Sequence, residues 1–152
     1  MTYKRILVPI DGSRASSRGL REAIRLARGE TATRLQLVHV VDEHTVLVSG
    51  AEVGPYMVNL MLELRRRGSR VLRNAEALVR RNGLKCTAVL LEAQAVPAAD
   101  LIVRQARKSR ADLIVIGTHG RRGLRRLIMG SDAEQIVRTA PVPVMLVRAP
   151  AT

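Results

Sequence analysis

The sequence predicts an α/β fold in which an open, parallel, five-stranded sheet carries helices on both faces. Short apolar runs alternate with amphipathic segments along all 152 residues, and no linker or repeat interrupts them. Strict alternation of strands and helices is typical of parallel sheets covered on both sides. Apolar residues make up 47% of the chain, which includes two Tyr and neither Phe nor Trp. We therefore expect one domain, residues 1–152, with an aliphatic core.

The first third of the chain predicts two strands separated by a helix. Residues 5–10 (RILVPI) form a nearly continuous apolar run, as expected of a strand buried on both faces. The segment that follows has apolar residues at helical spacing, and Gly29 is its predicted C-cap. Residues 34–42 (RLQLVHVVD) are the second strand. The helical positions are Leu20, Ala23, Ile24 and Ala27.

A long helix is predicted before the third strand. We expect it from Tyr56 to Asn82, where an Asn-Gly pair ends it, and we expect the third strand at residues 85–93 (KCTAVLLEA). Pro97 can occupy the first turn of the next helix. The buried stripe of the long helix should contain Leu60, Leu64, Val71, Ala75 and Leu78.

The last third continues the alternation. Residues 112–117 (DLIVIG) are the fourth strand, residues 131–140 a short helix stopped by Pro141, and residues 142–148 (VPVMLVR) the fifth strand. The run GTHGRRGLRRLIMGS, residues 117–131, joins the fourth strand to the short helix and contains four glycines and four arginines.

This glycine- and arginine-rich run is placed where phosphates are often bound. Ligands of open parallel sheets lie beyond the carboxyl ends of the strands, and helix N-termini present unpaired N–H groups to anions. Gly117, Gly120 and Gly130 allow close backbone approach, and Ser131 offers a hydroxyl and an N–H. The run is neither a P-loop nor a Rossmann fingerprint. It contains G-x2-G, nine further residues, and then G-S.

That spacing resembles the ATP-binding branch of the universal stress protein family, and the resemblance extends over nearly the whole chain. The segment ILVPIDGS resembles the family's first strand with its nucleotide-contacting aspartate, here Asp11. The segment LVHVVDE resembles the second strand, and the segment from ADLIVIG to VMLVR resembles the signature region and last strand. Three matching segments in the same order are more specific than one glycine pattern.

The resemblance implies a three-layer, Rossmann-like fold of the adenine nucleotide alpha hydrolase type, with strand order 3-2-1-4-5. It implies ATP as the ligand, accompanied by magnesium, which usually keeps several waters. It also implies a homodimer in which the last strands, Val142 to Val147, pair across a two-fold axis. The expected role is a nucleotide-dependent regulatory module in the stress response.

The same resemblance implies roles for individual residues. Ile10 and Val40 would line the adenine pocket, and Asp11 would approach the ribose or the metal-bridged phosphates. Asp132 departs from the family, whose members usually carry a small or neutral residue there. Its carboxylate either repels the γ-phosphate or holds Mg²⁺. The expected nucleotide-binding set is Pro9, Ile10, Asp11, Val40, Gly117, Thr118, Gly120, Arg121, Gly130, Ser131 and Asp132, with Asp11 also a candidate magnesium ligand.

Structural alternatives stay open for several of these residues. Asp11 can cap the helix that follows it, and Ser131 can be the N-cap of the last helix. His39, in the middle of a strand, is expected to pack in the core, whereas His119 is expected to face solvent. The arginines of the run form a solvated group of charges or contact phosphate, with Arg121 the first candidate. No catalytic residue is predicted, and a slow ATPase or a basic interaction protein without nucleotide are alternative functions.

Charge and cysteine content limit the classes of partner. The net charge of +13 comes from 26 basic residues spread along the whole chain, of which three are Lys. This charge favours a general attraction for polyanions, but two tyrosines are a poor supply for base stacking. Nucleic acid is therefore not expected as the main ligand.

The single Cys86 excludes an intramolecular disulfide, and no segment reaches the roughly 18–20 apolar residues that span a bilayer. We expect a cytoplasmic protein.

Overall fold

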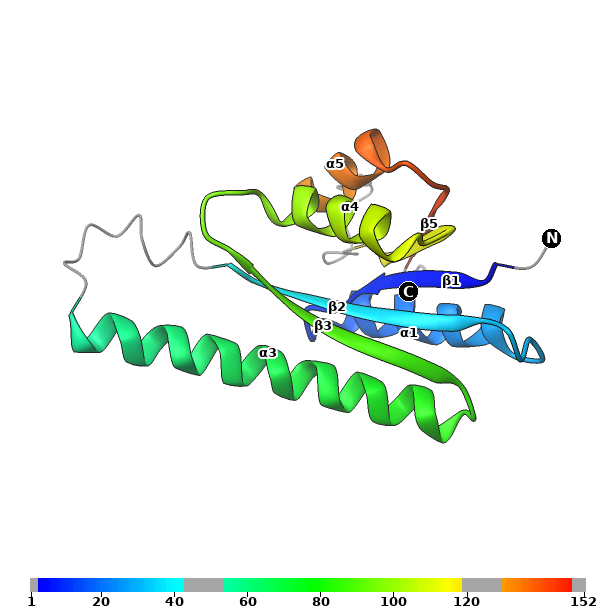
Figure 1. The fold of residues 1–152 in the computed structure, drawn as a ribbon, viewed down its shortest axis with the longest axis horizontal. Helices are drawn as coiled ribbons and strands as arrows, with labels where there is room; N and C mark the ends of the chain where they lie inside the picture. The colour runs from blue at the N-terminus through cyan, green and yellow to red at the C-terminus, as the bar shows by residue number, and fades with distance from the viewer. Residues whose placement is uncertain (1–2, 43–53, 119–129, 149–152) are drawn as a thin grey trace.

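The computed structural model describes residues 3–42, 54–118 and 130–148, which form five strands and four helices (Figure 1). The strands build one sheet of order β3-β2-β1-β4-β5, and every neighbouring pair is parallel. The predicted fold class and strand order are confirmed. The elements are β1 (Arg5–Pro9), α1 (Arg14–Ala27), β2 (Arg34–Asp42), α3 (Pro55–Arg81), β3 (Lys85–Ala93), α4 (Ala98–Ser109), β4 (Leu113–Gly117), α5 (Ser131–Thr139) and β5 (Val144–Val147).

The ends of some elements differ from the prediction. β1 ends at Pro9 rather than Ile10, although the Ile10 N–H still donates to the Val38 carbonyl at 2.7 Å. Pro97 is the N-cap of α4 rather than a residue of its first turn. β5 is shorter than predicted and begins after Pro143, which has no N–H to donate to a ladder. The C-cap of α1 is Arg28 rather than the predicted Gly29, which follows the cap with φ of +81° and so ends the helix.

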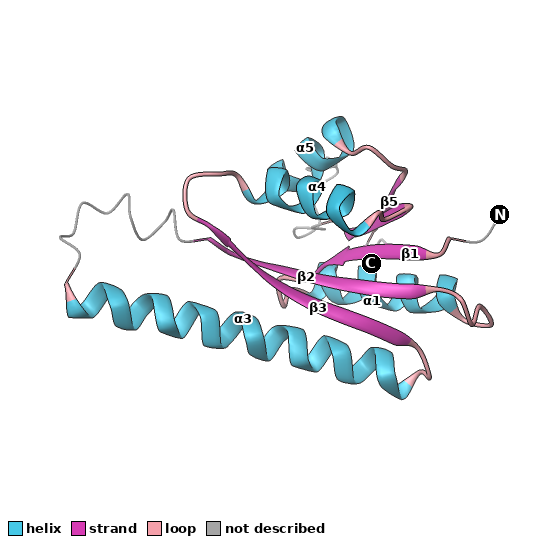
Figure 2. Ribbon diagram, viewed as in Figure 1, coloured by secondary structure: helices cyan, strands magenta, loops and turns pink. Residues whose placement is uncertain are grey.

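The helices lie in two layers, with α1 and α3 on one face of the sheet and α4 and α5 on the other (Figure 2). The central strand β1 contributes to both sides. Ile6 and Val8 pack with α1 and α3, whereas Leu7 packs with α4 and α5. All three side chains are at most 1% exposed. Burial on both faces explains why this strand is an uninterrupted apolar run.

Two glycines bring α1 unusually close to β4. A Cβ atom on Gly19 would lie 2.8 Å from the Gly117 nitrogen, and a Cβ atom on Gly117 would lie 1.7 Å from the Ala15 carbonyl oxygen. Neither separation is compatible with a real side chain. The start of α1 is therefore held against the carboxyl end of β4, where the chain enters the predicted binding run.

The buried stripe of the long helix α3 overlaps the predicted one in part. Ala75 is buried as expected, and the half-buried Val71 and Leu78 pack against the same core, whereas Leu60 and Leu64 are half-buried and belong to neither core cluster. The N-terminal part of α3 runs past the end of β3, leaving Tyr56, Val58 and Leu62 exposed (Figure 1). The described helices include none that is long and apolar enough to cross a membrane. The buried residues of α3 are Met57, Gly68, Leu72, Ala75 and Val79.

Candidate functional site

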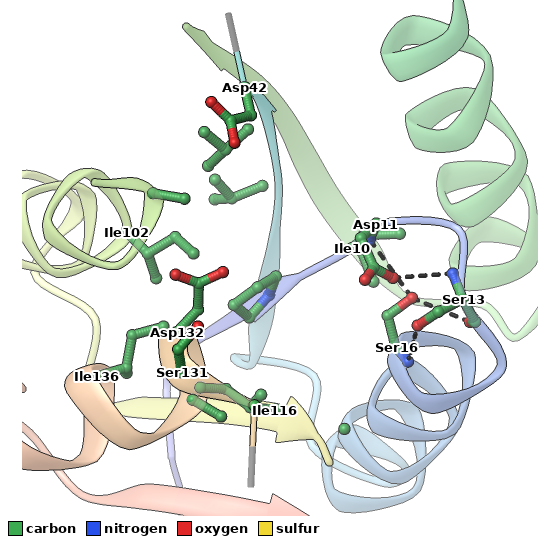
Figure 3. Close-up of a pocket in the computed structure, with 17 residues that line it drawn as sticks. Ile10, Asp11, Ser13, Ser16, Asp42, Ile102, Ile116, Ser131, Asp132 and Ile136 are labelled. Carbon is green, nitrogen blue, oxygen red and sulfur yellow. Dashed lines mark hydrogen bonds between the residues drawn. The ribbon is translucent and has the colours of Figure 1, made fainter. Parts of the chain in front are cut away.

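A pocket of about 370 Å³ lies at the carboxyl ends of β1, β2 and β4, next to the first turns of α4 and α5 (Figure 3). β1 and β4 are the neighbours between which the strand order reverses, which is where open α/β sheets bind ligands. The structure brings eight of the eleven expected binding residues to this pocket. They are Pro9, Ile10, Asp11, Val40, Gly117, Gly130, Ser131 and Asp132.

One side of the pocket is apolar. Ile10 follows β1, Val38 and Val40 come from β2, and Ile102 and Ile136 come from α4 and α5. The sheet and both helices fix these side chains, because Ile10, Val38, Ile102 and Ile136 are each no more than 6% exposed. A preformed aliphatic surface of this kind suits a flat, weakly polar group.

The first turn of α5 supplies the polar side of the pocket. Gly130 is the N-cap, and the first backbone bond of the helix runs from the Glu134 N–H to the Gly130 carbonyl at 3.0 Å. The N–H groups of Ser131, Asp132 and Ala133 precede that bond and have no partner within the helix. All three residues line the pocket. Unpaired amides and the positive end of the helix dipole together favour an anion here.

Ser131 is not the N-cap of this helix, so that structural alternative is wrong. It is the first residue inside α5, and no side chain caps the helix. Its exposed hydroxyl forms no hydrogen bond within the described residues. The hydroxyl therefore remains free of a capping role.

Asp11 orders the turn between β1 and α1. Its Oδ1 atom accepts a hydrogen bond from the Ser13 N–H at 2.8 Å, and the Asp11 N–H reaches the Ser16 Oγ at 3.4 Å. Ser13 is the true N-cap of α1, since its hydroxyl oxygen accepts from the Ser16 N–H at 3.1 Å. The structural alternative in which Asp11 caps the helix is therefore wrong. Asp11 instead holds the N-cap residue Ser13 through its backbone N–H, and it is exposed and lines the pocket (Figure 3).

The described lining of the pocket carries acidic groups and no basic ones. Asp11, Asp42 and Asp132 line it, and Figure 3 shows the Asp132 carboxylate among the lining side chains near Ile102. In the part of the chain that the structure describes, no three His, Cys, Asp or Glu side chains gather as a metal site. Protein groups alone would therefore give a magnesium ion few ligands, and phosphate and water would have to supply the rest.

Of the three remaining expected binding residues, the structure describes Thr118 alone. The Thr118 N–H and hydroxyl both reach the Val147 carbonyl, at 2.8 Å and 3.3 Å, so this residue continues the contact between β4 and β5. Thr118 is absent from the pocket lining. Gly120 and Arg121, like His119, lie outside the described residues.

His39 packs between the sheet and α3, as predicted for a core histidine, although it is half-buried. A Cβ atom on Gly68 would lie 2.6 Å from the His39 ring, so the glycine makes room for it. The ring Nδ1 lies 2.7 Å from the Ile10 carbonyl. A carbonyl only accepts, so Nδ1 must carry the proton. This bond fixes the backbone between the apolar side of the pocket and Asp11.

Several lining residues were not predicted. Val38 precedes the predicted Val40 by two positions on β2, so the period of two in a strand could have indicated it. Ala98 and Ile102 come from α4, whose position over the sheet depends on tertiary packing rather than on a local motif.

The strand order, with a pocket at the point where that order reverses, defines an α/β protein with a Rossmann-like fold of the adenine nucleotide alpha hydrolase-like kind. The chain belongs to the universal stress protein family, whose model matches residues 2–148.

Relatives of similar length support this assignment. A universal stress protein of Methanocaldococcus jannaschii is 34% identical over 97% of this chain and 84% of its own. A solved family member from Burkholderia pseudomallei is also 34% identical, with a TM-score of 0.77 over 97% of both chains. A universal stress protein of Archaeoglobus fulgidus solved in complex with dAMP is 25% identical, with a TM-score of 0.65, covering 96% of this chain and 98% of its own.

Proposed function

We propose that this protein binds ATP with magnesium in the pocket and acts as a nucleotide-dependent regulatory module. The observation that carries the proposal is the first turn of α5, whose residues line a pocket with an apolar side and have amides without a partner in the helix. The apolar side suits the base of an adenine nucleotide, and the amides suit its phosphate. A relative from Archaeoglobus fulgidus was solved with dAMP, which contains an adenine base and a phosphate.

We propose one orientation for the nucleotide in the pocket. Adenine would lie against Ile10 and Val40, and the ribose would lie near Asp11. The phosphates would extend to the amides of Ser131 and Asp132. The volume of about 370 Å³ is within the range of small-molecule sites.

The triphosphate needs positive charge that the described lining lacks. We propose that magnesium supplies part of it, with Asp11 near the metal-bridged phosphates. Arg121 and the Gly117, Gly120, Gly130 and Ser131 pattern of the ATP-binding branch would enclose the remaining phosphates. Asp132 makes this compensation more important, because its carboxylate lies in the same first turn.

We propose that the protein functions as a homodimer through β5 and the preceding residues, Val142 to Val147. β5 is the edge of the sheet, with β4 as its only sheet neighbour among the described strands. Its Leu146 side chain is 37% exposed. Pairing two such strands would satisfy their open backbone groups and cover the apolar edge.

Calorimetric titration tests nucleotide binding, preceded by an absorbance spectrum of the purified protein. The chain has no Trp, so co-purified nucleotide would give a clear excess at about 260 nm. We expect saturable binding of Mg-ATP and weaker binding when EDTA removes the metal. If neither ATP nor AMP binds at millimolar concentration, the proposal is wrong for this protein.

A further inference from the structure

The arginines of this chain are unevenly divided between its two helical layers. Helices α1 and α3 together contain eleven arginines, three glutamates, and no lysine or aspartate. Helices α4 and α5 contain four basic and three acidic residues. Charge that is spread along the sequence is therefore gathered by the fold on one side of the sheet.

Nine of these arginines are exposed, and we call them the arginine face. On α3, Arg66, Arg70 and Arg73 follow one another at helical spacing, on the opposite side from the buried Leu72 and Ala75. α1 and α3 share one buried core, and their C-terminal ends are joined by a hydrogen bond from Arg28 to Asn82 of 2.9 Å. The face consists of Arg14, Arg21, Arg25, Arg66, Arg67, Arg70, Arg73, Arg80 and Arg81.

Most of this positive charge is not neutralised by ion pairs among the described residues. Arg25 pairs with Glu22 and Arg80 pairs with Glu76, each along its own helix. The other seven arginines of the face form no ion pair with any described residue. A surface of one sign, with few internal partners, attracts a polyanion and concentrates it.

We propose that the arginine face binds the phosphate backbone of double-stranded DNA. The planar guanidinium group matches phosphate in a bidentate geometry, and this face uses arginine alone. From Arg66 to Arg81, α3 extends for about 22 Å, long enough to meet several phosphates of a duplex.

The composition of the face argues against other polyanions. The exposed apolar side chains Tyr56, Val58 and Leu62 of α3 all precede Arg66. From Arg66 to Arg81 the helix has no aromatic side chain to stack with single-stranded bases, and its exposed residues other than arginine are Asn74 and Ala77, which do not insert into membranes. Guanidinium contacts to phosphate need no 2′-hydroxyl, so a regular DNA duplex meets the requirements of the face. We expect this binding not to depend on the base sequence of the DNA, because it uses phosphate contacts alone.

A pair of charge-matched variants tests the proposal. The triple variant Arg66→Gln, Arg70→Gln and Arg73→Gln removes three charges from the face, and Arg104→Gln, Arg107→Gln and Lys108→Gln removes three exposed charges from α4. Binding to a labelled duplex of about 20 base pairs would be measured by fluorescence anisotropy between about 50 and 200 mM salt. Thermal unfolding would confirm that both variants fold.

We expect the α3 variant to lose at least about tenfold in affinity at the lower salt, and its slope of log K against log salt to fall by about two to three. The α4 variant should retain nearly wild-type affinity. Equal losses in the two variants would overturn the proposal, because binding would then follow net charge alone. Tighter binding to single-stranded DNA, duplex RNA, phosphatidylserine vesicles or polyglutamate than to duplex DNA would also overturn it.

Discussion

At the residue scale, the glycines of the predicted binding motif are needed for different physical reasons at different positions. Gly117 was expected to let the backbone approach an anion, but its missing side chain admits the Ala15 carbonyl at the start of α1. Gly130 has φ of −59° and ψ of 147°, which any residue can adopt, and it lines the pocket. In this motif, Gly117 is therefore needed for the packing of α1 against β4, whereas we propose that Gly130 is needed for ligand binding.

Replacing Gly117 by alanine should destabilise the fold. The new Cβ would lie 1.7 Å from a backbone oxygen, so α1 or β4 must move. We expect the free energy of unfolding in urea to fall by about 3 kcal/mol or more. Gly83→Ala is the control, because it has positive φ but open space around it and should cost about 1 kcal/mol. Equal losses would contradict the assigned contact.

Asp132→Asn should tighten AMP binding in EDTA by about threefold, because it removes a negative charge near the proposed phosphate position. Glu134→Gln is the matched control: it lies on the same helix, near Arg138 and outside the pocket lining, and should change little. Calorimetry in EDTA and in magnesium measures both. Weaker AMP binding by Asp132→Asn in EDTA would show that the carboxylate contacts the ligand favourably.

Cys86 should be a slow nucleophile in the folded protein. Burial raises the pKa of its thiol, the nearby Glu76 carboxylate raises this pKa further, and Arg80 offsets part of the effect. The neutral thiol therefore stabilises the fold below the unfolded pKa, and this contribution is lost as pH rises through the folded pKa. Alkylation at about pH 8 should be slower than in urea. Equal rates would contradict the raised pKa.

At the scale of elements, strands were easier to predict than helix orientations. β2 and β3 occupy the predicted residues, because both are mainly apolar runs with clear limits in the sequence, although β3 is an edge strand and is mostly half-buried. α3 was placed correctly to within a residue at each end, yet four of its five predicted core positions are only half-buried. A helix that extends past its sheet has apolar residues on more than one side, so periodicity does not identify the buried one.

In the site, too, some residues could be predicted from the sequence, whereas others depend on how the helices pack in the tertiary structure. The residues that begin α5 were predicted from the glycine spacing and the helix start, whereas those that end β1 were predicted from the family resemblance, and both groups line the pocket. The contributions of α4, including Ile102, depend on how that helix packs over the strand ends and have no local signature. The residues between Thr118 and Gly130 lie outside the described structure, so the predicted phosphate contacts of Gly120 and Arg121 stay predictions.

At the scale of the whole molecule, we propose different functions for the two helical layers that cover the sheet. The α4 and α5 layer borders the nucleotide pocket, and the α1 and α3 layer carries the arginine face. The edge strand β5 would join two such molecules.

Leu146→Lys should convert the proposed dimer to a monomer. The change places a charge on the exposed apolar edge, near its symmetry mate. Light scattering after size-exclusion chromatography gives the mass. Leu62→Lys on α3 is the control, because it changes a similarly exposed leucine on another element and should leave the mass unchanged. A wild-type monomer, or a Leu146→Lys dimer, would contradict this interface.

The central claim is that the first turn of α5 holds the phosphates of an adenine nucleotide. Calorimetric titration of Gly130→Val with Mg-ATP tests it most directly, because the valine narrows the pocket beside the α5 amides while the backbone there accepts any residue. We expect at least a roughly tenfold loss of affinity with thermal stability within about 1 kcal/mol of wild type. Wild-type affinity in a folded Gly130→Val protein would contradict the claim.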